Sequence, residues 1–517
     1  MARKYTRRET FSFLAGLALV VVWSKLPFLE GLFQNPNNTV AQVVTEMETL
    51  TQASTVSTSV PLLMTAYDAG GIGTQTQTTT TAASNDIYQI VNAAVVAGVT
   101  SIHLTAGSYI CSDTVLLNNI PNLEIYGDGQ DVTIIKLNPA LYKDMFEFLN
   151  CNNLHIHDLQ IDGNRTNQIT QSTTEINGIA IYGCDNVLIE KCYVHDCRVF
   201  GIEVAFNNVP STNVTIQNNI ISYCDANGIN INQVRNNNST PAGILVQNNT
   251  VSYSSDVGIT NLGGRSWTCT GNTVSHVDQS LSPFNVNSHI GIAASEGSAN
   301  PNPAYQPPPA GNSNPAVTNN TISACYVPND PNNNFGIGIW ANGGLQSGTE
   351  TLTTFTITGN NISGCKYGLD ISNAIAGATI QNNTFGGLPD KNSFLIYITA
   401  YNPSRGGAPN NIDITENNIG DGVNPPGWGP GSFLVRILDA ANEPPYSTGS
   451  ITNNTVNAGG QTSTFLVLSA FLTSEYWTTT PNTIVVPEFP SGDPIALSMI
   501  LAAVLLAFKK RSKAESN

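Results

Sequence analysis

A unit repeated along the middle of the chain constrains the fold more than any other feature of the sequence. Between about residues 177 and 265, three successive segments begin with Gly-Ile strands at Gly178, Gly201 and Gly228. Each strand is followed by a short polar turn and a second strand, which typically ends in Asn-Asn-x-Ile or Asn-Asn-x-Val. One such unit cannot bury its own apolar face, so the repeat predicts a solenoid in which successive units stack.

Asn219 gives the register of this repeat along the rest of the chain. The equivalent positions, from 23 to 48 residues apart, are Leu159, Cys192, Asn249, Asn272, Asn320, Asn360, Asn383, Asn417 and Asn454. The two shortest spacings predict units without loop insertions. Within every unit β-branched residues alternate, as is typical of strands rather than amphipathic helices. Asn side chains at equivalent positions of stacked strands can form a hydrogen-bonded ladder, which we expect here.

These features resemble the right-handed parallel β-helix of the pectin-lyase-like superfamily, and the resemblance extends over about residues 68–469. It implies an all-β fold, a single-stranded right-handed parallel β-helix (solenoid) with a short N-terminal capping helix and terminal hydrophobic segments. Apolar residues from Ile87 to Val99 fall on helical spacing after Ser84-Asn85-Asp86. A line similar to the opening strands of that superfamily, Ala106-Gly-Ser-Tyr-Ile110, follows. We therefore expect the β-helix to occupy residues 85–470.

The N-terminal end of the chain has a different character. In residues 1–33, four basic residues precede an apolar run from Phe11 to Trp23, which predicts a signal peptide or N-terminal anchor. The stretch Thr6-Arg-Arg-Glu-Thr-Phe11 resembles a twin-arginine signal. Residues 34–84 are rich in Gln, Asn, Thr and Ser and are expected to be a low-complexity spacer.

The C-terminal end carries a second membrane-type signal. Residues 471–490 are expected to be a linker that contains Val486-Pro-Glu-Phe-Pro490, and residues 491–517 combine an apolar run from Ile495 to Phe508 with a basic tail. This order resembles the sorting tail of archaeal surface proteins, in which Pro-Glu-Phe marks the processing site. The run is shorter than the ~20 residues that span a bilayer, but the Lys/Arg cluster favours a membrane segment. The resemblance implies an extracellular, cell-surface, membrane-anchored protein and a sorting enzyme that acts at Pro487–Pro490.

Charge and cysteine content limit the partners and the chemistry. The net charge is −16 and only 11% of residues are charged. Such a chain lacks the basic surface that binds nucleic acid. Nine Cys residues are present, so at least one has no partner within the chain. Cys151 and Cys184, like Cys197 and Cys224, occupy equivalent positions, where they either form disulfides or pack as small apolar side chains. No cysteine spacing indicates a zinc site.

Acidic residues precede the Gly-Ile strands of successive units: Glu175, Asp196, Asp225 and Asp256, with Glu203 on a strand. Stacked units lie about 4.8 Å apart, so carboxylates in one column would raise one another's pKa, as a glycosidase acid requires. Alternatively, Asp196 and Asp225 bind Ca²⁺, as carboxylates do in the pectate lyases of this superfamily. The carboxylate pair and the His of the polygalacturonases are missing at the matching positions, so that family's mechanism cannot be transferred.

A second column lies seven residues after each Gly and consists of Asp185, Asn208, Arg235 and Arg265. Two Arg residues one unit apart would suit a uronate or sulfate on a sugar chain. In lyases of the superfamily an Arg serves as the base, which makes Arg235 and Arg265 the candidates. Both columns could equally consist of turn residues on a polar face.

The sequence as a whole favours an envelope-anchored extracellular β-helix protein that binds polysaccharide. A polysaccharide lyase or glycoside hydrolase would place the acidic and Arg columns along one open groove. A non-catalytic adhesin or a structural component of the cell surface would not need paired carboxylates. The fold does not decide among them, because function resides in the site. The only cofactor suggested is Ca²⁺.

Overall fold

The structure is a computed structural model. It describes residues 63–64, 84–168, 176–205, 209–232, 243–262, 267–277, 289–295, 314–325, 336–342, 353–372, 375–389, 393–400, 409–420, 433–439, 447–457, 464–468, 477–479 and 482–485. The predicted signal peptide or anchor at 1–33 and the predicted membrane segment at 491–517 lie outside these residues. Among the residues that are described, no helix is long and apolar enough to cross a membrane.

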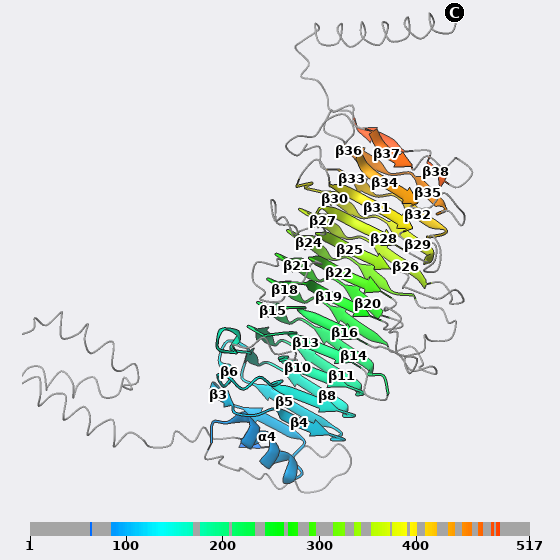
Figure 1. Cartoon of the computed structure of the whole chain (residues 1–517). Coiled ribbons are helices and arrows are strands. Elements are labelled where there is room, and N and C mark those ends of the chain that lie inside the picture. The colour runs from blue at the N-terminus through cyan, green and yellow to red at the C-terminus, as the bar shows by residue number, and fades with distance from the viewer. Residues whose placement is uncertain are drawn as a thin grey trace, which may run out of the picture. The chain divides into compact units, whose positions relative to one another are not determined.

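Three long sheets wind around a common axis, and each turn of the chain adds one strand to each sheet (Figure 1). Sheet A has 14 strands: β1 (Leu63–Met64), β2 (Ser101–Leu104), β5 (Leu123–Gly127), β8 (Asn152–His157), β11 (Asp185–Glu190), β14 (Thr212–Gln217), β17 (Ile244–Gln247), β20 (Trp267–Thr270), β23 (Ala316–Thr318), β26 (Thr353–Thr358), β29 (Ile375–Gln381), β32 (Ile412–Thr415), β35 (Gly449–Thr452) and β38 (Trp477–Thr478).

The strands of sheet B are short and follow those of sheet A in the chain. Sheet B has 13 strands: β3 (Gly107–Cys111), β6 (Thr133–Leu137), β9 (Gln160–Asp162), β12 (Tyr193–His195), β15 (Ile220–Ser222), β18 (Thr250–Ser252), β21 (Thr273–Ser275), β24 (Thr321–Ser323), β27 (Asn361–Ser363), β30 (Thr384–Gly386), β33 (Asn418–Ile419), β36 (Thr455–Asn457) and β39 (Thr483–Val485).

Sheet C contains the Gly-Ile strands of the repeat. Its 12 strands are β4 (Val115–Asn118), β7 (Phe146–Leu149), β10 (Ile179–Tyr182), β13 (Ile202–Ala205), β16 (Ile229–Asn232), β19 (Val257–Leu262), β22 (Ile290–Ser295), β25 (Ile337–Asn342), β28 (Tyr367–Ser372), β31 (Phe394–Ala400), β34 (Phe433–Asp439) and β37 (Thr464–Leu468). Apart from the antiparallel pair β1–β2, the strands pair in parallel, for example β13 with β16. The predicted all-β right-handed parallel β-helix is confirmed.

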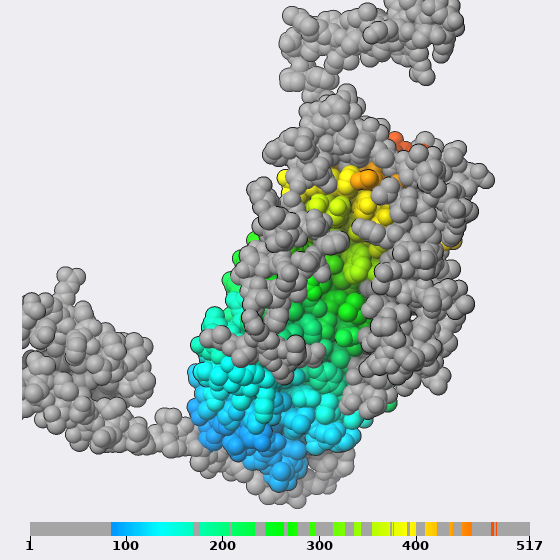
Figure 2. Space-filling view, viewed as in Figure 1, coloured from blue at the N-terminus to red at the C-terminus, as the bar shows by residue number. Residues whose placement is uncertain are grey.

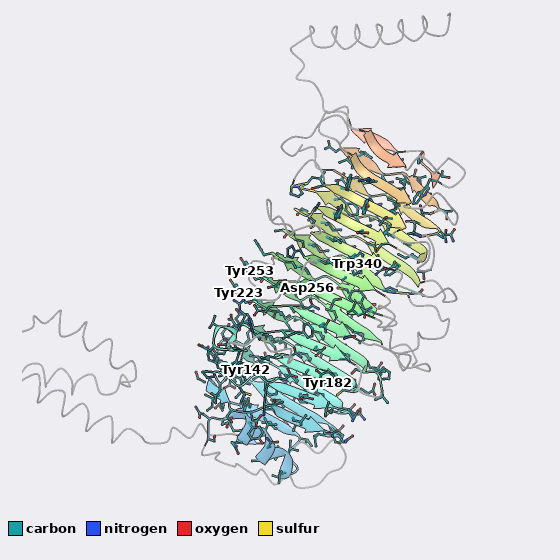
Figure 3. All side chains as sticks on the ribbon, viewed as in Figure 1. Tyr142, Tyr182, Tyr223, Tyr253, Asp256 and Trp340 are labelled. Atoms are coloured by element: carbon teal, nitrogen blue, oxygen red, sulfur yellow. The ribbon has the colours of Figure 1, made fainter. Side chains whose placement is uncertain are left out.

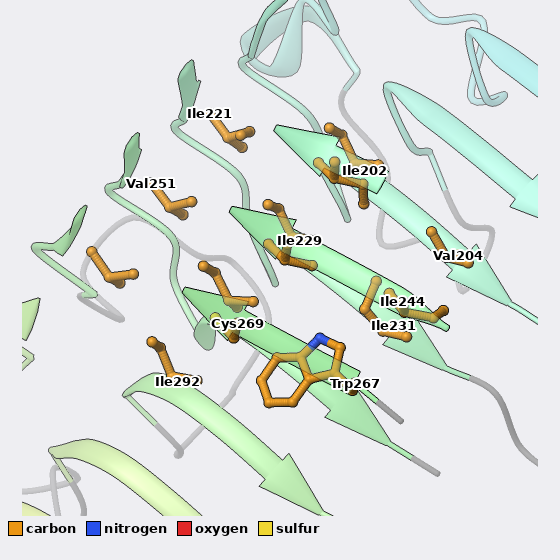
Figure 4. Packing of buried hydrophobic residues seen from close by; sticks show 14 of the residues in the cluster. Ile202, Val204, Ile221, Ile229, Ile231, Ile244, Val251, Trp267, Cys269 and Ile292 are labelled. Atoms are coloured by element: carbon orange, nitrogen blue, oxygen red, sulfur yellow. The ribbon is translucent and has the colours of Figure 1, made fainter. Parts of the chain in front are cut away.

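The core is a set of stacked aliphatic side chains between the three sheets (Figure 4). Ile202, Ile229, Ile259 and Ile292 pair in register in sheet C and are fully buried. Each fully buried aliphatic side chain contributes about 1.5–3 kcal/mol relative to an exposed one. Because the side chains of a strand alternate between its two faces, the residue that follows each of these isoleucines points outward.

A ladder of Asn side chains runs inside the turn from sheet A to sheet B. Nδ2 of each Asn donates to Oδ1 of the Asn in the next turn at 2.9–3.0 Å, from Asn219 to Asn482. At the start, the backbone N of Cys192 donates to Oδ1 of Asn219 at 2.9 Å. The predicted register and the predicted ladder are confirmed.

The N-terminal end is closed by the predicted capping helix, α4 (Ile87–Val96). The Asp86 side chain caps it by accepting from the backbone N of Tyr88 at 3.2 Å. Ile87, Ile90, Val91 and Ala94 of this helix are buried in the core.

The β-helix continues past its predicted end at residue 470, so the predicted linker 471–490 needs correction. Within it, β38 pairs with β35 and β39 pairs with β36. Asn482 continues the ladder by donating to the carbonyl O of Ile451 at 2.8 Å. The predicted spacer also contains structure, because β1 pairs with β2. Short strands of one or two apolar residues carry too little periodicity to be recognised in a sequence.

All nine Cys residues are buried and free. The sequence left open whether the Cys residues form disulfides or pack as small apolar side chains. In the structure they pack as small apolar side chains in the core. The predicted stacking is present, because the backbone N of Cys151 contacts Sγ of Cys184 at 3.2 Å.

Candidate functional site

One line of side chains crosses the outer face of sheet C at a single register position. Its members, here called the outer row, pair strand by strand: Leu116, Glu147, Ala180, Glu203, Asn230, Thr260, Ala293, Trp340, Asp370, Tyr397 and Arg436. Their flanking residues, such as Ile202 and Val204, are core residues. The row therefore faces outward, on the Gly-Ile strands of the repeat.

Glu203 is the centre of a hydrogen-bonded cluster on this row, and it is only 2% exposed. Its Oε2 accepts from Asn177 Nδ2 and from the Tyr182 hydroxyl, both at 2.8 Å. Its Oε1 accepts from Asn230 Nδ2 at 3.1 Å. We call Asn177, Tyr182, Glu203 and Asn230 the glutamate cluster. Because donors hold both oxygens, the carboxylate has a fixed orientation on the outer face.

Glu147 lies on the same row, at the edge of a cavity of about 590 Å³. Burial raises the pKa of Glu147. Ala180 lies between Glu147 and Glu203 in the row, so the two strands that carry the glutamates are roughly 10 Å apart. The cavity is lined by Tyr88, Asn92, Asp113, Thr114, Leu116, Tyr142, Lys143, Asp144 and Glu147.

A second cluster surrounds Asp370, which is 5% exposed. Its row neighbours are Trp340 and Tyr397. Its Oδ1 is buried and has no hydrogen-bond partner among the described residues. Burial raises the pKa of Asp370 to about 7. At neutral pH this carboxyl group therefore holds a proton a large part of the time and can donate it.

Aromatic rings and a cation complete this second cluster. The ring centroids of Tyr367 and Tyr397 are 5.2 Å apart, and those of Phe394 and Tyr397 are 5.7 Å apart. Arg436 Cζ lies 5.3 Å from the centroid of the Phe394 ring. We call Trp340, Tyr367, Asp370, Phe394, Tyr397 and Arg436 the aspartate–aromatic cluster. It combines apolar ring faces, a proton donor and a guanidinium group, which together can bind sugar rings and an acidic substituent.

The three described members of the predicted acidic column, Asp196, Asp225 and Asp256, do not stack, and this expectation needs correction. In sheet B, His195 pairs with Ser222 and Ser222 with Ser252. The residues that follow these strands, Asp196, Tyr223 and Tyr253, are therefore equivalent. The Tyr223 and Tyr253 rings are 4.7 Å apart, at the edge of sheet B (Figure 3). Asp225 and Asp256 are not equivalent either, because the backbone N of Asp225 donates to the carbonyl O of Cys197 and it is Ser255, not Asp256, whose backbone N donates to the carbonyl O of the equivalent Cys224.

Asp196 and Asp225 nevertheless both contact one guanidinium group. Arg165 Nη1 lies 2.8 Å from Asp225 Oδ1, and Arg165 Nε lies 3.6 Å from Asp196 Oδ1. Arg198 pairs with the other oxygen of Asp225. Burial raises the pKa of Asp225, although both arginines act in the opposite direction. Two guanidinium groups on one buried carboxylate are typical of a structural ion pair.

This pairing bears on the predicted calcium site at Asp196 and Asp225. The oxygens of Asp225 already face arginines, which leaves them poorly suited to Ca²⁺. Asp196 instead groups with Asp162 and His195, and one potential ligand atom from each lies within 4.8 Å of the others. Burial acts to raise the pKa of Asp196, but His195 and Arg165 outweigh it and lower that pKa. The calcium requirement stays a prediction.

Of the remaining predicted site residues, the structure describes only Asp256. Glu175, Arg235 and Arg265 lie outside the described residues. Asp256 lies between β18 and β19, where its carbonyl O accepts from the backbone N of Ile290 at 3.0 Å. Figure 3 shows Tyr182 and Trp340 on sheet C, well separated along the β-helix.

Glu147 and Asp370 are not among the candidates predicted from the sequence. One signal could have found Asp370. It is a carboxylate at the centre of the strand Tyr367-Gly-Leu-Asp-Ile-Ser372, whose other residues are uncharged.

Comparisons with known proteins agree on the architecture. The family model described as right handed beta helix region matches residues 70–274 and 211–385, which together make up more than half of the chain. A search of curated protein sequences gave no significant match.

Solved structures with the same architecture include two enzyme modules and a viral protein. The A-module of mannuronan C-5 epimerase AlgE6 of Azotobacter vinelandii is 16% identical, with a TM-score of 0.54 over 78% of this chain and 95% of that one. The A-module of epimerase AlgE4 of the same organism is 16% identical, with a TM-score of 0.53 over 76% and 95%. A mutant tailspike protein of E. coli bacteriophage HK620 is 14% identical, with a TM-score of 0.51 over 79% and 72%. At these identities the likeness shows the fold alone.

Proposed function

The chain belongs to the right handed beta helix family, and from this premise we propose that it binds a polysaccharide along the outer row of sheet C. The observation that carries the proposal is the aspartate–aromatic cluster, in which aromatic rings, a carboxyl group and Arg436 share one face. The mannuronan epimerase modules of the same architecture support a glycan ligand.

The spacing of the outer row suits an extended sugar chain. Strands in a sheet repeat at about 4.8 Å, close to the length of one sugar unit. The five strand steps from Glu203 to Asp370 correspond to roughly 24 Å. At one end Tyr182, the partly exposed member of the glutamate cluster, can contact the sugar chain, and at the other end the aspartate–aromatic cluster can stack against sugar rings.

Cleavage of the bound polysaccharide is the second candidate function, and Glu147 favours it. Its raised pKa suits a general acid, and Glu203, two strands away in the outer row, is the candidate general base. In this scheme Glu147 protonates the leaving oxygen while Glu203 removes a proton from the attacking water. A lyase that uses Arg235 or Arg265 as its base is the alternative carried over from the sequence.

A polysaccharide screen distinguishes these functions. The full-length protein is tested with and without Ca²⁺ against acidic and neutral polysaccharides, and binding and products are measured together. We expect saturable binding to at least one polysaccharide. New reducing ends that disappear in Glu147→Gln and Glu203→Gln would identify a hydrolase, and unsaturated products a lyase. Binding without products would identify an adhesin, and no binding to any polysaccharide would contradict the proposal in favour of a structural role.

We also propose that the protein is extracellular and anchored in the cell envelope by its terminal segments. The support is the sequence order of Pro487-Glu-Phe-Pro490, the apolar run and the basic tail. The full chain is expected to sediment with membranes. For a chain that ends at residue 490, the fraction that sediments with membranes is expected to be smaller. Equal distribution of the two forms would contradict C-terminal anchoring.

A further inference from the structure

Two histidines and a glutamate meet on the outer face of sheet A, near the N-terminal end of the β-helix. In the pair β5–β8, Glu124 lies opposite His155 and Tyr126 lies opposite His157. Because alternate residues of a strand face the same side, all three side chains project from one surface. One potential ligand atom from each lies within 4.8 Å of the others.

The distances within this group match the separations of ligands around one ion. Glu124 Oε1 lies 3.6 Å from His155 Nδ1 and 3.3 Å from His157 Nε2. A charge-assisted hydrogen bond is normally about 2.7–2.9 Å long, as in the 2.7 Å contact of His157 Nδ1 with Asp158 Oδ2. Two atoms that each lie about 2.0–2.1 Å from a tetrahedral Zn²⁺ are roughly 3.4 Å apart.

Each of the three side chains is also oriented by a further polar contact. His157 uses Nδ1 for Asp158, which leaves Nε2 free to face Glu124. His155 Nε2 lies 3.3 Å from Glu190 Oε1, which leaves Nδ1 on the side of Glu124. Metal-binding imidazoles usually have such a carboxylate on their second nitrogen.

The glutamate is oriented in the same way. Ser101 Oγ donates to Glu124 Oε2 at 2.6 Å, so Oε1 is the oxygen that faces the two histidines. The Oε1 atom of Glu124, Nδ1 of His155 and Nε2 of His157 therefore converge.

The charge of the surroundings favours a cation. Three carboxylates, those of Glu124, Asp158 and Glu190, contact the two imidazoles. Lys191 has an electrostatic interaction with Glu190, the carboxylate next to His155. The side chains of His155 and Glu124 are 31% and 38% exposed, so an ion can reach them.

We propose that Glu124, His155 and His157 form a binding site for a divalent transition-metal ion, for which Zn²⁺ fits best. Two imidazole nitrogens and one carboxylate oxygen form a three-ligand set that leaves a fourth tetrahedral position open. By the usual order of affinities, Ni²⁺ and Cu²⁺ would also bind. The ion would join β5 to β8 on the outer face of sheet A. The site is on sheet A and does not depend on the polysaccharide proposal for sheet C.

The test is a titration of the full chain with Zn²⁺ after metal has been removed with a chelator. We expect about one equivalent of Zn²⁺ to bind, and the affinity to fall at least a hundredfold in Glu124→Gln and His157→Gln. Asp158→Asn, which removes only the orienting carboxylate, is expected to weaken binding about 10–100-fold. His276→Gln is the matched control, because His276 lies on a turn after sheet B, away from this site. Its affinity for Zn²⁺ is expected to equal that of the unchanged protein.

Two further measurements distinguish loss of the proposed site from misfolding of a variant and from binding at the second group of potential ligands, Asp162, His195 and Asp196. Co²⁺ bound to the unchanged chain is expected to give the strong visible absorption of a four-coordinate ion. His195→Gln probes the group of Asp162, His195 and Asp196, and we expect it to leave Zn²⁺ binding intact. The proposal would be overturned by the absence of saturable Zn²⁺ binding, or by binding that survives His157→Gln and is lost in His195→Gln.

Discussion

Replacement of Asp370 by Asn is expected to stabilise the protein at about pH 8 and to change its stability little at about pH 4. Burial raises the pKa of Asp370 from 3.8 to about 7 in the folded protein. Between these two values the folded state holds a proton that the unfolded state has lost, so stability falls as the pH rises through this window. A pKa difference of this size corresponds to about 4 kcal/mol at full ionisation. Asn keeps the shape of the protonated carboxyl group and removes this cost.

The measurement is the denaturant-induced unfolding of both proteins across this pH range. Asp413→Asn is the control, because Asp413 is an exposed carboxylate on sheet A. The stability difference between Asp370→Asn and the unchanged protein should grow with pH, whereas the control should show no such growth. If Asp370→Asn has the pH dependence of the unchanged protein, Asp370 ionises in the ordinary range and cannot serve as a proton donor at neutral pH.

Replacement of Asn360 by Ala is expected to destabilise the protein by about 3 kcal/mol or more. Nδ2 of Asn360 donates to the carbonyl O of Val317 and to Oδ1 of Asn383, both at 2.9 Å. Its Oδ1 accepts from the backbone N and from Nδ2 of Asn320, both at 3.0 Å. The substitution leaves several buried polar groups short of a partner, and each such group costs about 1–3 kcal/mol.

The next residue provides a matched control. Asn361 begins β27 and is exposed, so Asn361→Ala changes the same residue type without touching the ladder. Its free energy of unfolding, measured in denaturant, is expected to stay within about 0.5 kcal/mol of that of the unchanged protein. Equal destabilisation by the two substitutions would mean that the ladder contributes nothing beyond an ordinary surface position.

The fold could be predicted from the sequence because its determinants are local and repeated. The spacing of Asn219, Asn249 and Asn272 gives the register directly, since each Asn occupies the same turn in successive units. The capping helix could be predicted because Asp86 and the apolar spacing after it are contiguous. The end of the β-helix was harder, since β38 and β39 are short and only Asn482 continues the pattern.

The site could be predicted far less well, because its members come from strands that are distant in the sequence. Glu124 and His155 are opposite each other only through the register of β5 and β8. Glu203 is held by residues from the turns before and after its own. The prediction of a stacked acidic column was wrong for the same reason, since the distance of a residue from the next Gly does not determine which turn positions are equivalent. Side-chain chemistry at a solenoid surface depends on this vertical pairing, which residue types alone do not reveal.

The central claim, that the outer row of sheet C binds a polysaccharide, is tested most directly by one pair of variants. Trp340 lies on the outer row and packs with Tyr367 at a buried apolar group. Tyr253 is an aromatic residue of similar size in the turn after sheet B. With the polysaccharide found by the screen, Trp340→Ala is expected to lower the affinity about tenfold or more, through the loss of about 1.4 kcal/mol of binding free energy, while Tyr253→Ala leaves it unchanged. Unchanged binding by Trp340→Ala together with weakened binding by Tyr253→Ala would contradict the claim and place the glycan on the other side of the β-helix.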